Sequence, residues 1–375
     1  MRVALNALAV APDRPGGDGT YVRELVRRLP RLAQRDEWLV FLTPDAARLF
    51  DPPAQNVRPV LCRLPSRSLV VRALWEQVAL PRLIERYRVD VVHAPVNVAP
   101  LAARVPIVLT LHEAEPFMPS SGVPVPLVAW WRAVRSLSAR RAERIVTVSA
   151  SARADLTRWM GIAPARIDVI PLGVDTSYFT PDGPAPDSAV EPPGRPFVLW
   201  VGRPYPSKNL GRLVAAFAQL RRSGRQELLV LAGPRGWSDA ELSRVVERSG
   251  WAGAMVRRPP LGPSLVAWYR AAAAFAFPSL RETFGLPVLE ALACGTPVVA
   301  SDIPALRAVG GSAAVFADPL SSSSLARALA DVLRDTDFRE RARATGPRQA
   351  AHFSWAATAE ATYAVYRGLD GARSH

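Results

Sequence analysis

The feature that most restricts the fold is the alternation of short apolar runs with helical segments along the whole 375-residue chain. Apolar runs that read as buried strands occupy residues 2–7, 38–43, 89–93, 106–111, 145–148, 197–201, 228–231, 271–277 and 297–300. Helical segments, such as residues 20–29, lie between them. This alternation predicts an α/β chain with doubly wound parallel sheets, which bind ligands at the carboxyl ends of their strands.

The length of the chain predicts two domains, because 375 residues are many for one hydrophobic core. The proline-rich stretch 181–196 separates the two sets of strands and reads as a linker. We therefore expect one Rossmann-like domain over residues 1–180 and a second over residues 197–352. A C-terminal helical segment over residues 353–375 follows the last strand–helix unit.

The sequence contains no uncharged apolar stretch long enough to span a membrane, and its N-terminus reads as a strand rather than as a signal peptide. Cys62 and Cys294 are isolated and lack the spacing of a metal site. We therefore expect a cytoplasmic chain whose two thiols are buried and reduced.

The chain is strongly basic, with a net charge of +14. Residues 1–180 contribute +8 (24 basic and 16 acidic residues), and the remainder contributes +6 (23 and 17). Arginines are spread through the helices without interleaved aromatic residues, so we expect no nucleic acid as a partner. An anionic small molecule and the anionic inner face of the plasma membrane are the preferred partners. Residues 63–88 and 127–144 combine apolar and basic side chains, as a membrane-surface helix does, although an ordinary surface helix is the alternative.

One residue stands out from this basic composition. Lys208 is the single lysine among 47 basic residues, and all the others are arginines. A compact ammonium suits a diphosphate oxygen in a tight site better than a forked guanidinium does. Arg203 and Lys208 both lie in the run WVGRPYPSKNL after an expected strand, where two cations can neutralise a diphosphate. Two exposed loop charges are the alternative reading.

The run from Glu282 to Glu290 carries the most specific pattern. It begins in a loop after the strand 271–277 and continues into a helix over residues 286–294, with Pro287 near its first position. Amides at a helix start bind phosphate, and carboxylates accept hydrogen bonds from hydroxyl groups. A sugar nucleotide, with a hydroxyl-rich ring on each side of a diphosphate, satisfies both. The alternative is that Glu290 complements the helix dipole and Glu282 is a solvated loop charge.

Two further segments lie at expected strand ends. Gly16, Gly17 and Gly19, in the run PGGDGTYVREL, allow a close approach of backbone to a phosphate, although a plain turn is the alternative. His112 ends the apolar run IVLTLH, and we favour a functional role over a structural one. His93 also ends a strand and is assigned to packing.

The run from Glu282 to Glu290 resembles the E-x7-E signature of the retaining glycosyltransferases of family 4, and the resemblance extends over nearly the whole chain. It implies the GT-B fold, with two Rossmann-like domains facing across a cleft. It also implies that Glu282 contacts the donor sugar and that Glu290 holds the ribose. The same resemblance implies that the backbone amides of Phe284, Gly285 and Leu286 contact the donor as well.

Other positions take their expected roles from the same resemblance. The loop Gly17–Gly19 would touch the donor phosphate and the acceptor, Arg203 and Lys208 the diphosphate, and His112 the donor sugar. Three positions depart from the pattern: Thr283 stands where many relatives have glycine, Ser207 where many have arginine, and Glu113 where aspartate is common.

The implied reaction is a retaining transfer of a hexose, without an enzymic nucleophile, a metal or a cofactor. His112, Glu282, Arg203 and Lys208 are the expected catalytic residues. The first domain would bind a glycan or lipid-linked acceptor and the second the donor, while the last helix crosses back onto the first domain. Asp335 and Asp337 form a D-x-D pattern, but they lie in a polar helical stretch and are not expected to bind metal.

The layout of the glycine loop and of the runs WEQVALPRL and HAPVNVAPL is similar to that of mannosyltransferases of polysaccharide biosynthesis, so GDP-mannose is the expected donor. A sugar-nucleotide epimerase or a phosphorylase on the same fold is an alternative. A phosphorylase, however, would need a lysine for its own cofactor. A non-catalytic basic protein that binds nucleic acid or lipid is the alternative from another class.

Overall fold

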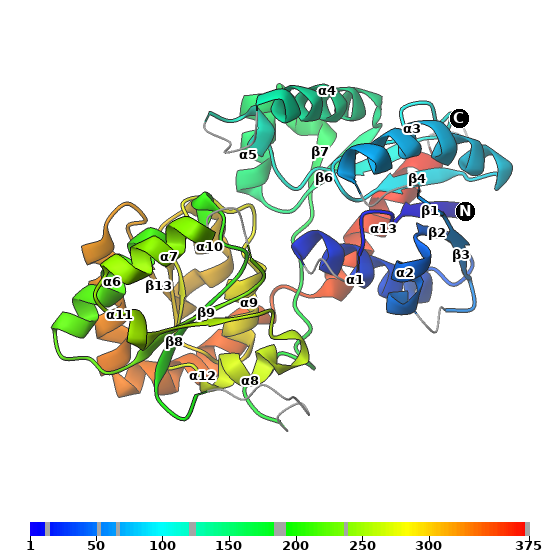
Figure 1. Cartoon of the computed structure of the whole chain (residues 1–375). Coiled ribbons are helices and arrows are strands. Elements are labelled where there is room, and N and C mark those ends of the chain that lie inside the picture. The colour runs from blue at the N-terminus through cyan, green and yellow to red at the C-terminus, as the bar shows by residue number, and fades with distance from the viewer. Residues whose placement is uncertain are drawn as a thin grey trace. The chain divides into compact units, whose positions relative to one another are not determined.

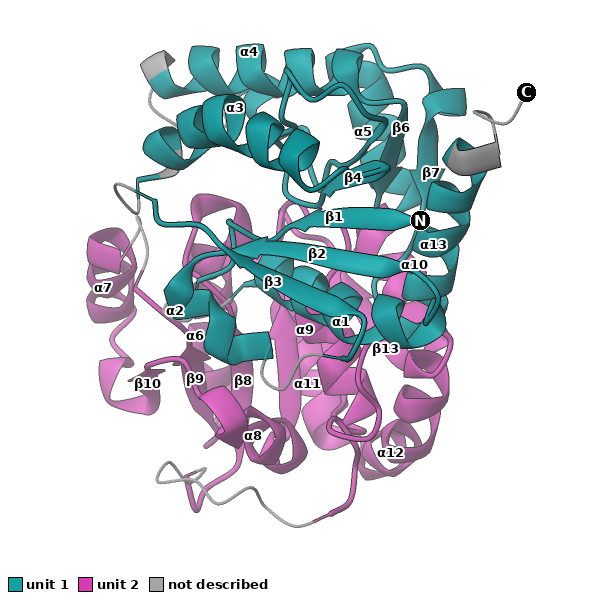
Figure 2. Cartoon of the chain, turned by 90° about the vertical axis from the view of Figure 1, so that its right-hand side faces the viewer, with its two compact units in different colours: residues 1–173, 355–375 teal, residues 174–354 magenta. Residues whose placement is uncertain are grey.

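The computed structural model describes residues 1–11, 16–50, 54–64, 68–119, 125–183, 193–235 and 239–371. It forms two compact units, which Figure 2 shows in different colours: unit 1 is Met1–Gly173 with Trp355–His375, and unit 2 is Val174–Ser354.

The division between the units falls after Gly173 rather than at residue 180. The carbonyl groups of Thr180 and Asp182 accept hydrogen bonds from the guanidinium of Arg270 in unit 2, so the start of the expected linker packs within that unit. Residues 184–192 of the linker lie outside the described part of the chain.

Unit 1 contains a seven-stranded sheet in which every pairing is parallel. In spatial order its strands are β3 (Val57–Leu61), β2 (Glu37–Leu42), β1 (Arg2–Asn6), β4 (Val91–Ala94), β5 (Ile107–Thr110), β6 (Arg144–Thr147) and β7 (Ile167–Val169). The inner strands are buried on both faces, as continuous apolar runs predict for a parallel sheet.

Helices cover both faces of this sheet. They are α1 (Gly17–Leu32), α2 (Pro44–Ala47), α3 (Leu69–Arg86), α4 (Val125–Arg141), α5 (Ala150–Met160) and α13 (Trp355–Gly371). Figures 1 and 2 show α3 and α4 on one face, and α1 with α13 on the other. Tyr363 of α13 donates a hydrogen bond from its hydroxyl to Asp36 at 2.8 Å, which fixes this last helix within unit 1.

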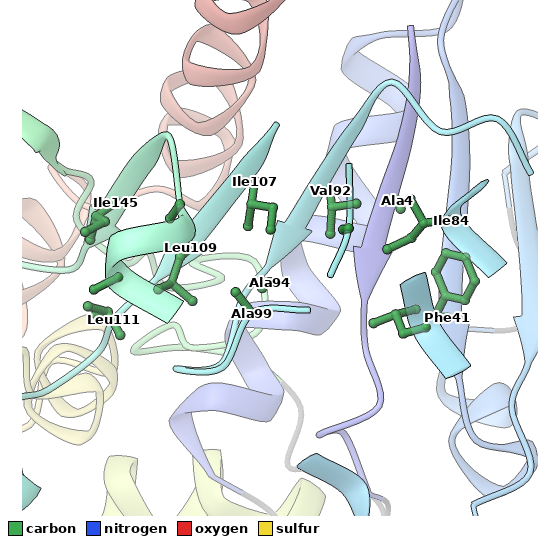
Figure 3. Packing of buried hydrophobic residues seen from close by; sticks show 14 of the residues in the cluster. Ala4, Phe41, Ile84, Val92, Ala94, Ala99, Ile107, Leu109, Leu111 and Ile145 are labelled. Carbon is green, nitrogen blue, oxygen red and sulfur yellow. The ribbon is translucent and has the colours of Figure 1, made fainter. Parts of the chain in front are cut away.

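The core of unit 1 lies between the sheet and the helix face that contains α3. Figure 3 shows Ala4, Val92, Ile107 and Ile145 from β1, β4, β5 and β6 in one continuous row, with Ile84 of α3 beside it. All five side chains are buried. Burial of such a row stabilises the unit through the removal of apolar area from water.

Unit 2 contains a six-stranded parallel sheet with the order β10 (Met255–Arg258), β9 (Leu228–Ala232), β8 (Phe197–Val201), β11 (Ala274–Phe277), β12 (Val298–Ser301) and β13 (Ala314–Ala317). Its helices are α6 (Leu210–Arg222), α7 (Asp239–Arg248), α8 (Leu265–Ala271), α9 (Leu286–Ala293), α10 (Pro304–Gly310), α11 (Ser322–Arg334) and α12 (Thr336–Ala350). Short 3₁₀ turns join several elements, including η4 (Pro206–Lys208), which lies after β8. The predicted α/β class with two parallel sheets is therefore confirmed.

Four strands were not predicted from the sequence, and each is an edge strand of its sheet: β3 and β7 in unit 1, β10 and β13 in unit 2. One side of each has no neighbouring strand, so few of its residues are buried: one of five in β3, one of three in β7, none in β10 and one of four in β13. In β3 only Val60 is buried, and Pro59 interrupts the pattern, which an edge strand tolerates. A strand at the edge of a sheet is less buried, so its sequence shows a weaker apolar pattern.

The structure also shows the surroundings of smaller features of the sequence. Cys62 and Cys294 are free and buried. Asp335 is the N-cap of α12 and accepts a hydrogen bond from the amide of Phe338 at 2.8 Å, so its carboxylate has a structural role. Within the described residues, no helix is long and apolar enough to cross a membrane.

The loops after β8 and β9 approach each other so closely that only glycine fits at Gly233. Its φ is +148°, and a Cβ added there would lie 1.8 Å from the carbonyl oxygen of Gly202. We expect Gly233→Ala to lower stability by about 2–4 kcal/mol, because the backbone of both loops must move. The matched control is Gly224→Ala, where φ is +91° but no atom lies within 4 Å. Equal thermal unfolding midpoints of the two variants would contradict the importance of this contact.

Candidate active site

The predicted donor-binding residues of unit 2 gather after two strands that are direct neighbours in its sheet, β8 and β11. Arg203 and Lys208 follow β8, Glu282 follows β11, and Glu290 lies in α9. Since both strands are parallel, their carboxyl ends meet at one edge, and this is where ligands of doubly wound sheets bind.

Lys208 and Glu282 form an ion pair, with 2.5 Å between Nζ and Oε1. Their side chains are 20% and 12% exposed, so the pair is largely removed from water. The ring of Phe277 lies 5.4 Å below the ammonium, and the amide of Leu280 donates to the carbonyl of Ser207 at 2.8 Å. The single lysine of the chain is therefore held against the first glutamate of the E-x7-E pattern. Together they present a cation for phosphate and an acceptor for hydroxyl groups.

Arg203 lies nearby but is held separately. Its Nη1 donates to the carbonyl of Arg235, in the loop after β9, at 3.3 Å. Within the described residues, no hydrogen bond or ion pair joins Arg203 to Lys208 or Glu282. The side chain is only partly buried, so its charge can turn toward an anion without breaking a strong contact.

The start of α9 supplies free backbone donors. Gly285 has a φ of +107° and precedes the first residue, Leu286. A Cβ at Gly285 would meet Leu306 at 2.6 Å, so glycine is required for both conformation and space. No described residue accepts a hydrogen bond from the amide of Gly285 or Leu286. Donors of this kind at a helix start favour an anion.

Glu290, the second glutamate, lies one turn into α9 and accepts a hydrogen bond from the hydroxyl of Tyr269 at 3.0 Å. Burial raises the pKa of Glu290 to about 7, and the bond from Tyr269 opposes this shift. The sequence analysis did not identify Tyr269, because nothing in its local pattern on α8 distinguishes it from a core aromatic residue. Its contact with Glu290 depends on the packing of α8 beside α9.

A second residue that the sequence analysis missed, Asn209, joins three loops of unit 2. It follows Lys208 directly, is 6% exposed, and donates from Nδ2 to the carbonyls of Pro278 at 2.9 Å and Pro319 at 2.8 Å. Those two residues follow β11 and β13. Its Oδ1 accepts a hydrogen bond from Nη1 of Arg212 at 2.8 Å. The amide thus uses both donors and its acceptor within the protein.

In unit 1, the predicted glycine loop proves to be part of a helix. Helix α1 begins at Gly17 rather than at Thr20, so Gly17 and Gly19 lie in its first turn, and Gly16 is the N-cap. The first-turn amides of a helix have no acceptor within it, so glycine costs less there than further along. Residues 12–15, which precede this start, lie outside the described part of the chain.

His112 follows β5 and is 7% exposed. Its Nε2 lies 2.9 Å from the carbonyl of Pro95 and 3.8 Å from the carboxylate of Asp18, on α1. A carbonyl can only accept, so Nε2 donates to Pro95, and Nδ1 is the second polar atom of the ring. The ring of Tyr21 packs edge-on against the imidazole, with 5.2 Å between the centroids. His112 is therefore fixed in orientation near the start of α1.

The other groups near His112 have structural partners. His93 is fully buried, bonded to Thr110 at 2.8 Å and to Tyr366 at 2.5 Å, and burial lowers the pKa of His93 to about 3. It is therefore neutral, in keeping with its expected role in packing. Glu113, whose role the sequence left open, accepts a hydrogen bond from Arg135 of α4 at 3.4 Å.

Comparison with known proteins identifies the family. The family profile described as Glycosyltransferase Family 4 matches residues 15–178, and that described as Glycosyl transferases group 1 matches residues 185–349. The chain is also similar to the O-antigen chain mannosyltransferase B of Escherichia coli. The two are 30% identical over 372 residues, which cover 94% of this chain and 96% of the relative.

Solved structures with the same fold extend over the full length of the chain. Sucrose-phosphate synthase from Thermosynechococcus elongatus has a TM-score of 0.78 at 22% identity, over 99% of both chains. Anabaena HepE, solved in complex with UDP and glucose, has a TM-score of 0.75 at 19% identity, over 98% of this chain and 100% of HepE. The predicted GT-B class is confirmed, and the chain is a glycosyltransferase that belongs to family 4.

Proposed function

We propose that this glycosyltransferase moves a hexose from a nucleoside-diphosphate sugar to a glycan or lipid-linked acceptor, with retention of configuration and without a metal or other cofactor. The observation that carries the proposal is the Lys208–Glu282 pair beside the free amides of α9, with Glu290 one turn further on. A diphosphate needs the cation and the amides, and the two flanking sugars need the carboxylates.

The chemical step is the departure of the nucleoside diphosphate from the anomeric carbon. Negative charge develops on the leaving phosphate, and Lys208, Arg203 and the amides of Gly285 and Leu286 would stabilise it. Such stabilisation by fixed donors is usually the largest single contribution to catalysis. The cationic side chains and amides supply it without a metal.

Retention requires the acceptor hydroxyl to attack from the face that the phosphate leaves. In our proposal the leaving phosphate accepts the proton of that hydroxyl, so no enzymic nucleophile takes part. Glu282 would hold the hydroxyl groups of the transferred sugar. His112, fixed in orientation within unit 1, is proposed to contact the same sugar, and Gly17 and Gly19 the donor phosphate.

The donor is proposed to be GDP-mannose. The support is the 30% identity, over nearly the full length of both chains, to a protein named as an O-antigen chain mannosyltransferase. That name places the relative in polysaccharide synthesis and supports a glycan acceptor. HepE, whose structure contains UDP and glucose, has the same fold, so both bases belong in any test.

We further propose that the protein is cytoplasmic and contacts an anionic membrane through α3. Val70, Leu74 and Val78 follow one another at intervals of four residues and are 36%, 56% and 58% exposed. Arg82 and Arg86, further along the same helix, are exposed. Apolar side chains beside cations are typical of a surface that lies on anionic lipid.

The structure favours α3 over α4 for this contact. On α4, Arg132 donates to the carbonyl of Pro116 at 2.6 Å and Arg135 to that of Glu113 at 3.3 Å. These cations therefore hold the segment after β5 in place. Leu137 is the one large apolar side chain of α4 that is strongly exposed among the described residues.

The proposed function is tested by Lys208→Ala and Glu282→Ala. Each should lower the rate of transfer by about 100-fold or more, because each removes a group that contacts the reacting donor. Lys208→Ala should also lose the thermal stabilisation that GDP or UDP gives the wild type. Transfer from GDP-mannose and UDP-glucose is measured together with melting temperatures in UDP and GDP.

The matched control for this test is Arg225→Ala. Arg225 pairs with Glu227 in the same unit, and the side chains are 31% and 12% exposed, comparable to the Lys208–Glu282 pair. This variant loses an ion pair just before β9, at the opposite edge of the sheet, and should retain full transfer. Full activity of Lys208→Ala or Glu282→Ala would refute the assignment.

The raised pKa of Glu290 predicts a pH dependence of nucleotide binding. As the pH rises through about 7, the carboxylate ionises and becomes a stronger acceptor for the ribose hydroxyls, so affinity for the bound nucleotide should increase. Glu290→Gln cannot ionise and should lack this increase. Affinities of both proteins are measured by calorimetry between pH 5.5 and 8.5, at intervals of about one pH unit. Because the nucleotide titrates equally in both experiments, parallel curves would contradict the role of Glu290.

The membrane contact is tested with vesicles. The wild type should sediment with vesicles of phosphatidylglycerol and phosphatidylcholine but not with phosphatidylcholine alone, and added salt should weaken the binding. The double variant Leu74→Glu/Val78→Glu should lose it. Leu320→Glu is the control, because Leu320 is 68% exposed but lies in unit 2. Equal loss in both variants, or none in either, would rule out α3 as the contact surface.

A further inference from the structure

Three residues other than glycine have a positive φ among those the structure describes: Arg88 at 51°, Asn97 at 57° and Asn209 at 60°. This left-handed conformation costs energy for a residue with a side chain, and asparagine tolerates it best. Arg88 is exposed in the turn after α3, where such a conformation commonly ends a helix. The two asparagines are each only 6% exposed, one in each unit.

Asn209 joins the loop of Lys208 to the loop of Glu282. The carbonyl of Pro278, which accepts from its Nδ2, lies in the segment that leads from β11 to Glu282. Its second acceptor, the carbonyl of Pro319, lies in the loop after β13. Asn209 is also the C-cap of the turn η4 and the N-cap of α6, so its left-handed conformation lies where the segment of Lys208 turns into the helix.

Asn97 has a comparable position in unit 1. It follows β4, and its backbone amide donates to the carbonyl of Thr110 at 3.0 Å. Its side-chain Oδ1 accepts a hydrogen bond from the backbone amide of His112 at 3.0 Å. These bonds connect the carboxyl ends of the neighbouring strands β4 and β5. The backbone amide of His112 is thus held by a side chain, through the Oδ1 of Asn97.

We propose that Asn209 and Asn97 are positioning residues for the transfer reaction. Asn209 holds Lys208 against the segment of Glu282, and Asn97 holds the backbone of His112. The inference rests on the proposed function, because Lys208 and His112, which the two asparagines hold, act in the proposed reaction. Non-glycine residues in strained conformations cluster at functional sites, where the surrounding structure maintains them. Both asparagines meet this description, whereas Arg88 does not.

Replacement by glycine isolates the side chain, because glycine adopts the same φ without strain. In Asn209→Gly, affinity for UDP or GDP, whichever binds the wild type, should fall about tenfold, as expected for a weakened contact between Lys208 and the phosphates. In Asn97→Gly, nucleotide affinity should stay unchanged while kcat falls by about 100-fold, the effect of a reacting group displaced by about 1 Å. A purely structural role would not separate affinity from rate in this way.

Arg88→Gly is the matched control, since it makes the same change at a left-handed position whose backbone amide bonds only to the carbonyl of Glu85 in its own turn. It should retain wild-type affinity and rate. Asn209→Asp is the second variant: it keeps the shape of the side chain but places a carboxylate against two carbonyls, and it should also lose affinity. If Asn209→Gly does not fold, Asn209→Asp decides the question.

The outcomes separate this inference from the proposed function. A wild type that binds neither UDP nor GDP would overturn the proposed function, and the inference with it. A wild type that binds nucleotide, together with asparagine variants that behave like Arg88→Gly in both affinity and kcat, would overturn the inference alone.

Discussion

The ion pair between Lys208 and Glu282 depends on the parallel pairing of β8 with β11. Because both chains run in the same direction, the segments that follow them emerge at one edge of the sheet, although the residues are 74 positions apart in the sequence. The amide of Leu280 and the side chain of Asn209 then fix one segment against the other. A partly buried charge pair is costly to desolvate, so it persists where both charges are well partnered.

The electrostatic character of unit 2 follows from this arrangement. A cation, free helix-start amides and two carboxylates lie in the segments after β8 and β11, but the two carboxylates differ in environment. Glu282 is paired with Lys208, whereas burial raises the pKa of Glu290 to about 7 and only the hydroxyl of Tyr269 opposes it. Two glutamates eight positions apart thus acquire different properties from their neighbours.

Much of the fold was predictable because buried parallel strands need continuous apolar runs. All nine strands expected from such runs are present, and they are the inner strands of the two sheets. The edge strands β3, β7, β10 and β13 were missed because a strand with one neighbour is less buried. The start of α1 was placed at Thr20 instead of Gly17, since glycine is a poor guide within the first turn of a helix.

The sequence by itself determined the α/β class, the order of the inner strands along the chain and the candidate residues from Arg203 to Glu290, because strand burial and helix starts leave local patterns. Only the tertiary structure decided that Lys208 meets Glu282, that Tyr269 supports Glu290, and that Asn97 and Asn209 bridge neighbouring loops. These contacts join segments from different strands and helices. They are set by strand order and helix packing, which no local spacing encodes.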